Sequence, residues 1–239
     1  MTRVPMTAVT PDSLKRFVFD VLRAMGLPDE EAEIFGGALI FSELRFHPGH
    51  GQGVKKLRRY WGRFDEGGID PGAPWEIVKE SPALALVDAN NGIGTVAATR
   101  AMRLAIEKSK VCGIGQVIVR DSTHFGSSAV HACLGPEAGC IGIAMTNAGP
   151  EMAPWGGREG VVGTNPWGIA APTGLGFPAA ARDRARARIF RNPPRPDERT
   201  MFPSTSSLQT VPLGTADGRA RRSRRWIVRA SPSAHPERG

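Results

Sequence analysis

Three clusters of polar residues follow short apolar runs in the middle of the chain. Residues 121–124, of sequence DSTH, follow the apolar run 116–120, and residues 146–148, TNA, end the run 141–146. A third cluster, GTNP, occupies residues 163–166. Hydroxyl, amide and imidazole groups at the carboxyl ends of strands are a common way to build a ligand site in an α/β sheet. Each cluster alone is also typical of a turn, so the prediction of a small-molecule site rests on all three.

Two histidines lie in a glycine-rich loop nearer the N-terminus, within the sequence ELRFHPGHGQGV at residues 43–54. His47 and His50 carry imidazoles that titrate near neutral pH, so either is a candidate to exchange a proton with a substrate oxygen. The alternative for both is a loop imidazole that bonds the backbone. A metal site of His47, His50 and Glu43 is not favoured, because the three ligands share one Gly-Pro loop with no companion site elsewhere.

Composition is that of an ordinary globular protein. Of the 239 residues, 41% are hydrophobic and 23% are charged. No apolar run approaches the length of a membrane span, and the N-terminus lacks the apolar centre of a signal peptide. We therefore expect a cytoplasmic protein with no membrane partner. Three cysteines have neither ligand spacing nor an even count, so small buried thiols are expected.

The net charge of +8 belongs to the end of the chain. Residues 181–239 hold 14 arginines and five acidic residues, a charge of +9, which leaves −1 for residues 1–180. An Arg-rich tail can contact phosphates, so nucleic-acid binding is one alternative function. It is not favoured, because the body is near neutral and Trp226 is the single aromatic residue among the tail's last arginines.

The elements that must position these groups alternate between helix and strand. Apolar periodicity and capping residues predict helices from Pro11 to about Met25, from about Asp29 to Leu44, over 54–65 with Leu57, Trp61 and Phe64 inward, over 94–110 and over 127–134. Strands are predicted over 75–79, 83–88, 116–120 and 141–146. The alternation indicates an α/β body. Gly135-Pro136 is expected to interrupt its helix.

The pattern fails in the last quarter of the chain. Residues 177–239 are rich in Arg and Pro and hold no sustained period, so an irregular, disordered tail is expected. We divide the chain into a helical segment with the donor loop at 1–70, an α/β cofactor-binding region at 71–176 and the tail at 177–239. One hypothesis for the tail is an out-of-frame reading of a GC-rich gene.

Taken together, five short motifs resemble one known family. They are HFG at 124–126, TNA at 146–148, PWGGR at 154–158, GTNP at 163–166 and APTG at 171–174. Their order and spacing are similar to those of the malate/L-lactate dehydrogenase family, NAD(P)-dependent enzymes of 2-hydroxy and 2-oxo acids that lack a Rossmann domain. The resemblance runs from about residue 9 to 176. It implies a mixed sheet with flanking helices, here truncated and followed by the irregular tail.

The resemblance also implies a proton donor and a carboxylate clamp. The family's donor is a His in a Ser-His-Gly triplet, for which His50 is the nearest match and His47 the second choice. An alignment from the helix side instead places Gln52 on the donor position. For the clamp the same alignment selects Lys56, with Arg45 as the alternative. The alternative is that Lys56 and its basic neighbours only form a solvated face of the helix.

The remaining implied site residues bind the cofactor, NAD or NADP, and the substrate. The cofactor residues are His124, Phe125, Gly126, Ser127, Ser128, Thr146 and Asn147, and the substrate residue is Thr164. The resemblance implies a homodimer acting on a small 2-hydroxy or 2-oxo acid. The chain departs from the family at 178–181, PAAA, where an Asp-containing strand is expected. A non-catalytic remnant of the family, or an interaction protein with a basic tail, is therefore the alternative to an active dehydrogenase.

Overall fold

The computed structural model describes residues 8–45, 53–173, 179–183 and 226–232. The helices are α1 (Pro11–Ala24), α2 (Asp29–Leu44), the short 3-10 helix η2 (Val54–Lys56), α3 (Leu57–Asp65), α4 (Gly94–Cys112), α5 (Ser128–Ala132) and α6 (Leu134–Glu137). The strands are β1 (Glu76–Glu80), β2 (Leu84–Asp88), β3 (Gly115–Arg120), β4 (Cys140–Thr146), β5 (Trp167–Ala171), β6 (Ala179–Asp183) and β7 (Trp226–Pro232). The predicted α/β body is confirmed, with boundaries that differ by a residue or two.

The strands form one mixed sheet in the order β1-β2-β3-β7-β4-β5-β6. The β2–β3 pair is parallel and the other pairs are antiparallel. Because β3 and β4 are both antiparallel to β7, they run in the same direction, two strand spacings or roughly 10 Å apart. Their carboxyl ends, which carry the first two polar clusters, therefore lie at the same edge of the sheet.

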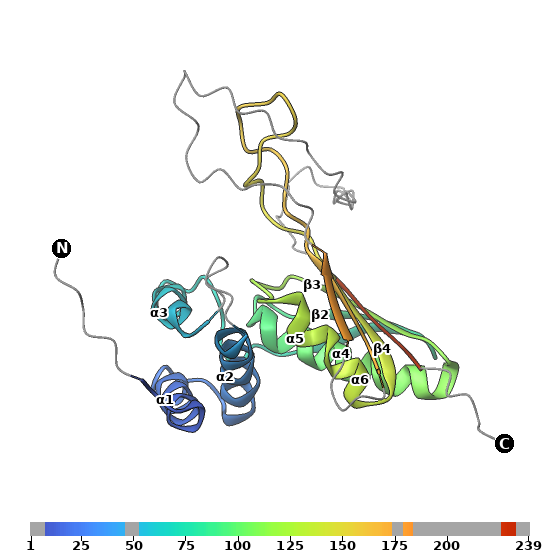
Figure 1. The fold of residues 1–239 in the computed structure, drawn as a ribbon, viewed down its shortest axis with the longest axis horizontal. Helices are drawn as coiled ribbons and strands as arrows, with labels where there is room; N and C mark the ends of the chain where they lie inside the picture. The colour runs from blue at the N-terminus through green and yellow to red at the C-terminus, as the bar shows by residue number, and fades with distance from the viewer. Residues whose placement is uncertain (1–7, 46–52, 174–178, 184–225, 233–239) are drawn as a thin grey trace.

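The described helices lie in two groups, with α4, α5 and α6 beside the strands and α1, α2 and α3 farther from them (Figure 1). Helices α4, α5 and α6 pack directly on the strands, and one core cluster joins Met102 of α4 to Val117 and Val119 of β3. Helix α1 packs on α2, α2 packs against α4, and a second cluster that includes Phe35, Tyr60 and Val96 joins residues of α1, α2 and α3 to the start of α4. The site described below lies where these two groups meet.

Gly115 and Gly142 let α4 and α5 approach the strands closely. A Cβ on Gly115 would lie 1.9 Å from the carbonyl oxygen of Ala105, and one on Gly142 would lie 2.1 Å from that of Ala132. Gly135 similarly faces the backbone of Gly142. The expected interruption at Gly135-Pro136 takes the form of a break between α5 and α6 at Cys133, with Pro136 inside the short second helix.

The first helix begins as predicted, because the Thr10 hydroxyl accepts a hydrogen bond from the Ser13 amide and Pro11 opens the helix. The inward face predicted for residues 54–65 was partly wrong. Leu57 is buried and Phe64 half-buried, but the Trp61 side chain is 54% exposed and Tyr60 takes the inward position. Tyr60 and Leu57 are three residues apart and so share one face of α3.

The stretch 177–239 was expected to be irregular, and two strands lie in it. Strand β6 pairs with β5, and β7 pairs with both β3 and β4. The overall Arg and Pro content concealed the short apolar run WIV at 226–228, which is long enough for strand pairing.

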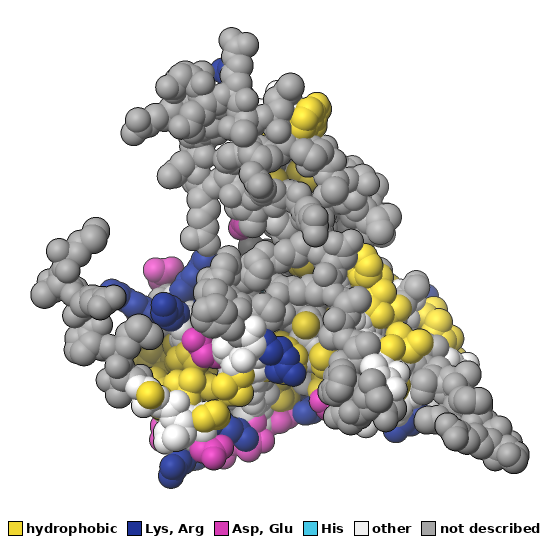
Figure 2. All heavy atoms as spheres, viewed as in Figure 1, with side chains coloured by type: hydrophobic (Ala, Val, Ile, Leu, Met, Phe, Trp, Pro, Cys, Tyr) yellow, Lys and Arg dark blue, Asp and Glu magenta, His cyan; other side chains and the backbone are white. Residues whose placement is uncertain are grey.

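The visible surface carries both charged and apolar side chains, which lie beside one another at the lower left of Figure 2. In Figure 2 acidic and basic side chains gather along the lower edge, and hydrophobic side chains emerge on the right. Among the described residues, no helix combines the length and apolarity that crossing a membrane requires.

Candidate functional site

His124 is held at the end of β3 by contacts with the first turn of α4. The preceding residue, Thr123, accepts a hydrogen bond from the Gly94 amide (3.0 Å) and donates one to the Gly92 carbonyl oxygen (2.8 Å). A Cβ on Gly94 would lie 2.7 Å from the His124 carbonyl oxygen. Thr123 therefore acts as a helix cap, and the absence of a side chain at residue 94 lets the His124 backbone sit against the helix.

The His124 imidazole joins three chain segments that are far apart in sequence. The Tyr60 hydroxyl lies 2.9 Å from Nδ1, and Lys56 Nζ lies 3.3 Å from Nε2. The Gly126 amide also donates to Nδ1, over 3.2 Å. The cation assigned from the helix-side alignment and the histidine of the HFG motif are thus in direct contact. We call Lys56, Tyr60 and His124 the Lys–Tyr–His cluster.

Burial shifts the pKa of both Lys56 and Tyr60. Desolvation lowers the pKa of Lys56 to about 8, and the positive charges of Arg59 and Arg63 act in the same direction. The carboxylate of Glu151, on the loop after β4, acts in the opposite direction. Burial also raises the pKa of Tyr60, so its hydroxyl stays protonated across the physiological range. Burial therefore brings the pKa of the cluster's lysine well below that of an ordinary lysine.

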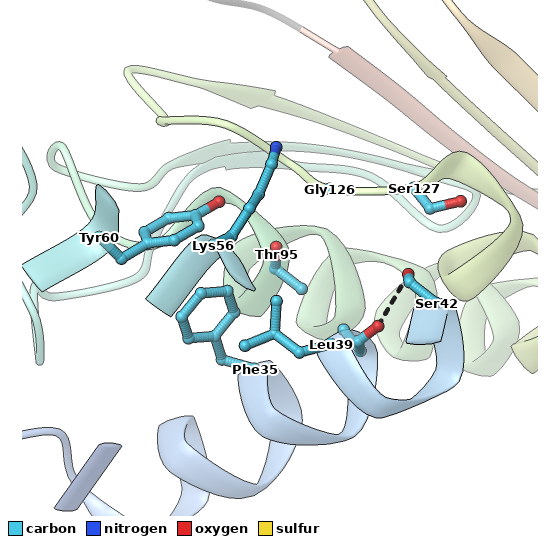
Figure 3. A pocket seen from close by; sticks show the side chains of 9 residues that line it. Phe35, Leu39, Ser42, Lys56, Tyr60, Thr95, Gly126 and Ser127 are labelled. Atoms are coloured by element: carbon cyan, nitrogen blue, oxygen red, sulfur yellow. Dashed lines mark hydrogen bonds between the residues drawn. The ribbon is translucent and has the colours of Figure 1, made fainter. Parts of the chain in front are cut away.

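A small pocket opens beside the cluster (Figure 3). It is lined by Phe35, Ala38, Leu39 and Ser42 of α2, Lys56 and Tyr60, Thr95 of α4, and Gly126 and Ser127 before α5. Figure 3 shows Lys56 and Tyr60 extending toward the segment that carries Gly126. Gly126 has φ of +82°, and a Cβ there would lie 3.1 Å from Thr95 Oγ1, so a larger residue would be strained and would crowd the pocket.

Two buried polar atoms at this pocket have no hydrogen-bond partner among the described residues, and a third follows strand β4. In the part of the chain that the structure describes, four buried side-chain polar atoms have no hydrogen-bond partner: Trp75 Nε1, Thr95 Oγ1, Ser127 Oγ and Asn147 Oδ1. Thr95 and Ser127 line the pocket. A buried hydroxyl without a partner costs about 1–3 kcal/mol, which a bound polar ligand would recover.

The second and third polar clusters lie side by side. The Asn165 carboxamide oxygen accepts a hydrogen bond from the Ala148 amide (2.8 Å), and the Thr146 amide donates to the Pro166 carbonyl oxygen (3.1 Å). Thr164 is half-buried beside these contacts. Residues 147–166, which connect β4 to β5, form an arm that extends from the edge of the sheet in Figure 1.

Two expected cofactor residues have their side chains in the core. Phe125 is 3% exposed and its ring lies 4.9 Å from that of buried His131, whose Nε2 donates to the Phe125 carbonyl oxygen. Ser128 packs against Gly168 of β5, since a Cβ on that glycine would lie 3.0 Å from the Ser128 hydroxyl. These residues hold the HFG segment in place from within the protein.

The expected proton donors His50 and His47, with Gln52, lie outside the described residues. The two sides of their loop are nevertheless joined, because the Glu43 carboxylate accepts a hydrogen bond from the Val54 amide (2.9 Å). Arg45, the alternative clamp, has its guanidinium 3.4 Å from the centre of the Phe41 ring. The expected clamp candidates therefore have different neighbours, and of the two Lys56 contacts His124.

Sequence reasoning did not select Tyr60 as a site residue. It is the single tyrosine of the chain, on a helix face that also carries Leu57. A buried tyrosine normally requires a partner for its hydroxyl, which is the signal that would have drawn attention to it. Its partner, 64 positions away in sequence, follows from tertiary structure alone.

Comparison with known proteins identifies the family. A sequence model described as malate/L-lactate dehydrogenase matches residues 9–191. The chain belongs to the malate/L-lactate dehydrogenase family. Malate dehydrogenase of Pyrococcus horikoshii is 42% identical over 165 residues, 69% of this chain and 45% of that protein. L-sulfolactate dehydrogenase of Methanocaldococcus jannaschii is 39% identical over 160 residues, 67% of this chain and 46% of that one.

Solved structures of the family agree with the fold. The structure of the Pyrococcus horikoshii malate dehydrogenase matches with a TM-score of 0.71 and 39% identity, covering 75% of this chain and 51% of that one. The Methanocaldococcus jannaschii sulfolactate dehydrogenase matches with a TM-score of 0.70 and 35% identity, over 75% and 51%. The chain thus spans about half the length of the family members that it matches.

Proposed function

We propose that this chain is an NAD(P)-dependent oxidoreductase that interconverts a small 2-hydroxy acid and the corresponding 2-oxo acid. The observation that carries the proposal is the contact between Lys56 and His124 beside a pocket with unpaired hydroxyls. Its relatives are named malate dehydrogenase, L-sulfolactate dehydrogenase and 2,3-diketo-L-gulonate reductase. All three names describe oxidoreductases whose substrates have an oxygen function next to a carboxylate.

The residues at the sheet edge fit a nicotinamide. The unpaired oxygens of Thr95, Ser127 and Asn147 are hydrogen-bonding groups of the kind that a carboxamide and a ribose would satisfy. When bound, the nicotinamide supplies or accepts the hydride. The segment 124–127 and residues 146–147 would hold it. We also propose that the cofactor is NAD or NADP, that the protein forms a homodimer, and that it is located in the cytoplasm.

The polar groups around the pocket would bind and orient the acid. Lys56 brings a positive charge toward the pocket, and Thr164 stands near the second polar cluster as the proposed substrate contact. The apolar wall formed by Phe35, Ala38 and Leu39 excludes water from one side. Exclusion of water strengthens charge interactions inside a site. A negatively charged 2-oxo acid therefore matches the charge and polarity of this region.

Fluorescence titration of the full chain with NADH and NADPH tests the proposal. We expect saturable binding of at least one cofactor and turnover of at least one acid in a scan of 2-oxo acids. A folded chain that binds neither cofactor would favour the non-catalytic alternative. Circular dichroism of the same sample establishes that the chain is folded.

A further inference from the structure

The hydrogen bonds at His124 differ between its two ring nitrogens. Nδ1 receives the Gly126 amide over 3.2 Å and lies 2.9 Å from the Tyr60 hydroxyl. A backbone N–H can only donate, so Nδ1 acts as an acceptor. A neutral imidazole has one hydrogen, which must then be on Nε2. Nε2 faces Lys56 Nζ at 3.3 Å.

This arrangement determines which form of Lys56 is favoured. An ammonium has three hydrogens and no acceptor, so it cannot accept the hydrogen of Nε2. A neutral amine has a lone pair and can. A hydrogen bond to the neutral form of a base favours that form. Removal of Lys56 from water acts in the same direction, because desolvation disfavours the ammonium.

The other charged groups around Lys56 act in both directions. Arg59 and Arg63 on α3 disfavour its ammonium, and Glu151 on the loop after β4 favours it. On α2, the Glu43 carboxylate bonds to the Val54 amide two residues before Lys56. The buried Tyr60 hydroxyl stays uncharged. Burial, together with the charges of Arg59, Arg63 and Glu151, gives Lys56 a pKa of about 8, which is within the pH range in which enzymes work.

We propose that Lys56 is the acid–base residue of this site, and not a permanent cation that only holds the substrate carboxylate. This inference rests on the proposed function. In the direction of reduction, as the hydride reaches the carbonyl carbon, the Lys56 ammonium gives one proton to the carbonyl oxygen. The products are the 2-hydroxy acid, the oxidised cofactor and a neutral amine. The amine then accepts the Nε2 hydrogen bond of His124 until it regains a proton from water.

The variant Lys56→Arg separates the two roles. Arginine keeps the positive charge and improves the geometry for a carboxylate, but it does not lose its proton in proteins. If Lys56 is the acid–base residue, kcat falls about 100-fold or more while KM for the acid changes much less. If Lys56 only holds the carboxylate, Lys56→Arg keeps its kcat or exceeds the wild type, and the inference is overturned. The control is Lys55→Arg, which changes the exposed neighbouring lysine.

The pH dependence has a defined sign. Reduction needs the ammonium, so its rate falls as pH rises through about 8, and oxidation of the hydroxy acid rises over the same range. In the Lys56→Arg variant this titration is absent from any residual activity. An unchanged pH profile in that variant would overturn the assignment.

A second measurement needs neither cofactor nor activity. Trace labelling of the full chain with acetic anhydride across a pH series, read by mass spectrometry, reports the midpoint at which each lysine becomes a free amine. We expect Lys56 to label with a midpoint near 8 and the His124→Phe variant to shift that midpoint upward. Labelling of Lys56 at the ordinary lysine value of about 10.4 would overturn the inference.

The tests separate this inference from the proposed function. A wild-type chain with turnover and an equally active Lys56→Arg variant would refute the role of Lys56 alone. A wild-type chain that binds neither cofactor would refute the proposed function and, with it, the catalytic role of Lys56. Even if the chain binds neither cofactor, the labelling midpoint of Lys56 shows whether His124 and burial favour its neutral amine.

Discussion

The Tyr60 hydroxyl orients the His124 imidazole. This buried hydroxyl lies 2.9 Å from Nδ1, on the side of the ring opposite to Lys56. The variant Tyr60→Phe removes this contact and leaves the Gly126 amide as the Nδ1 donor. We expect a loss of about 1 kcal/mol in the free energy of unfolding, measured by urea denaturation.

The same variant should change the titration of Lys56. With Nδ1 held less firmly as an acceptor, the Nε2 hydrogen is less favoured, so the midpoint of Lys56 labelling should rise. A purely structural role for Tyr60 would leave that midpoint unchanged. The control is Trp61→Phe, at the adjacent residue, whose side chain is 54% exposed and should tolerate the change within about 0.5 kcal/mol.

His131 gives a second residue-scale prediction, on stability. It is fully buried and bonded to the Phe125 carbonyl oxygen, and burial lowers its pKa from 6.5 to about 4. Because the unfolded chain binds the proton more readily, His131 contributes stability above pH 6.5 that is lost as pH falls toward 4. The expected slope is about 1.4 kcal/mol per pH unit.

Urea denaturation at several pH values tests this expectation. The comparison variant is His131→Gln, which lacks the titrating ring. The difference in unfolding free energy between wild type and variant should shrink as the pH falls from 6.5 to 4. A constant difference over that range would mean that His131 does not contribute to acid sensitivity.

At the scale of elements, close helix–strand contacts position the site. A Cβ at Gly142 would lie 2.1 Å from the Ala132 carbonyl oxygen, where neither backbone can yield easily. The variant Gly142→Ala should therefore lower the free energy of unfolding by about 3 kcal/mol. The matched control is Gly37→Ala, in the exposed face of α2 with nothing within 4 Å of the added Cβ.

The two glycine variants should have opposite signs. Gly37→Ala should raise the free energy of unfolding by about 0.5–1 kcal/mol, because alanine loses less backbone entropy than glycine in a helix. Both effects are measured by urea denaturation. A Gly142→Ala variant as stable as the wild type would show that α5 and β4 are not packed as closely as described.

Most of these elements could be predicted from the sequence, because capping residues and apolar alternation involve residues that are neighbours along the chain. Thr10-Pro11 marked the start of α1, and the apolar alternation of β3 and β4 marked strands whose ends carry polar residues. The position of β7 between β3 and β4 was not predictable, since strand order depends on contacts between distant segments. The inward position of Tyr60 was missed because Trp61, the larger aromatic residue, fits the same amphipathic pattern.

At the scale of the whole molecule, family membership was predictable and the assembled cluster was not. Five short motifs in the right order were enough for the resemblance, and the family match over residues 9–191 confirmed it. The contact of Lys56 with His124 joins positions 68 apart, and no sequence pattern encodes that pairing. Because the chain spans about half the length of its relatives, its activity must be measured on this chain itself.

The most direct measurement is the rate of NADH or NADPH consumption with each of a set of small 2-oxo acids, by the wild-type chain and by His124→Gln. We expect consumption that depends on one of these acids by the wild type, and a loss of about 100-fold in the variant because Lys56 is then misplaced, with both proteins folded. Wild-type protein without acid-dependent consumption, or a variant as fast as the wild type, would contradict a dehydrogenase site built around the Lys–Tyr–His cluster.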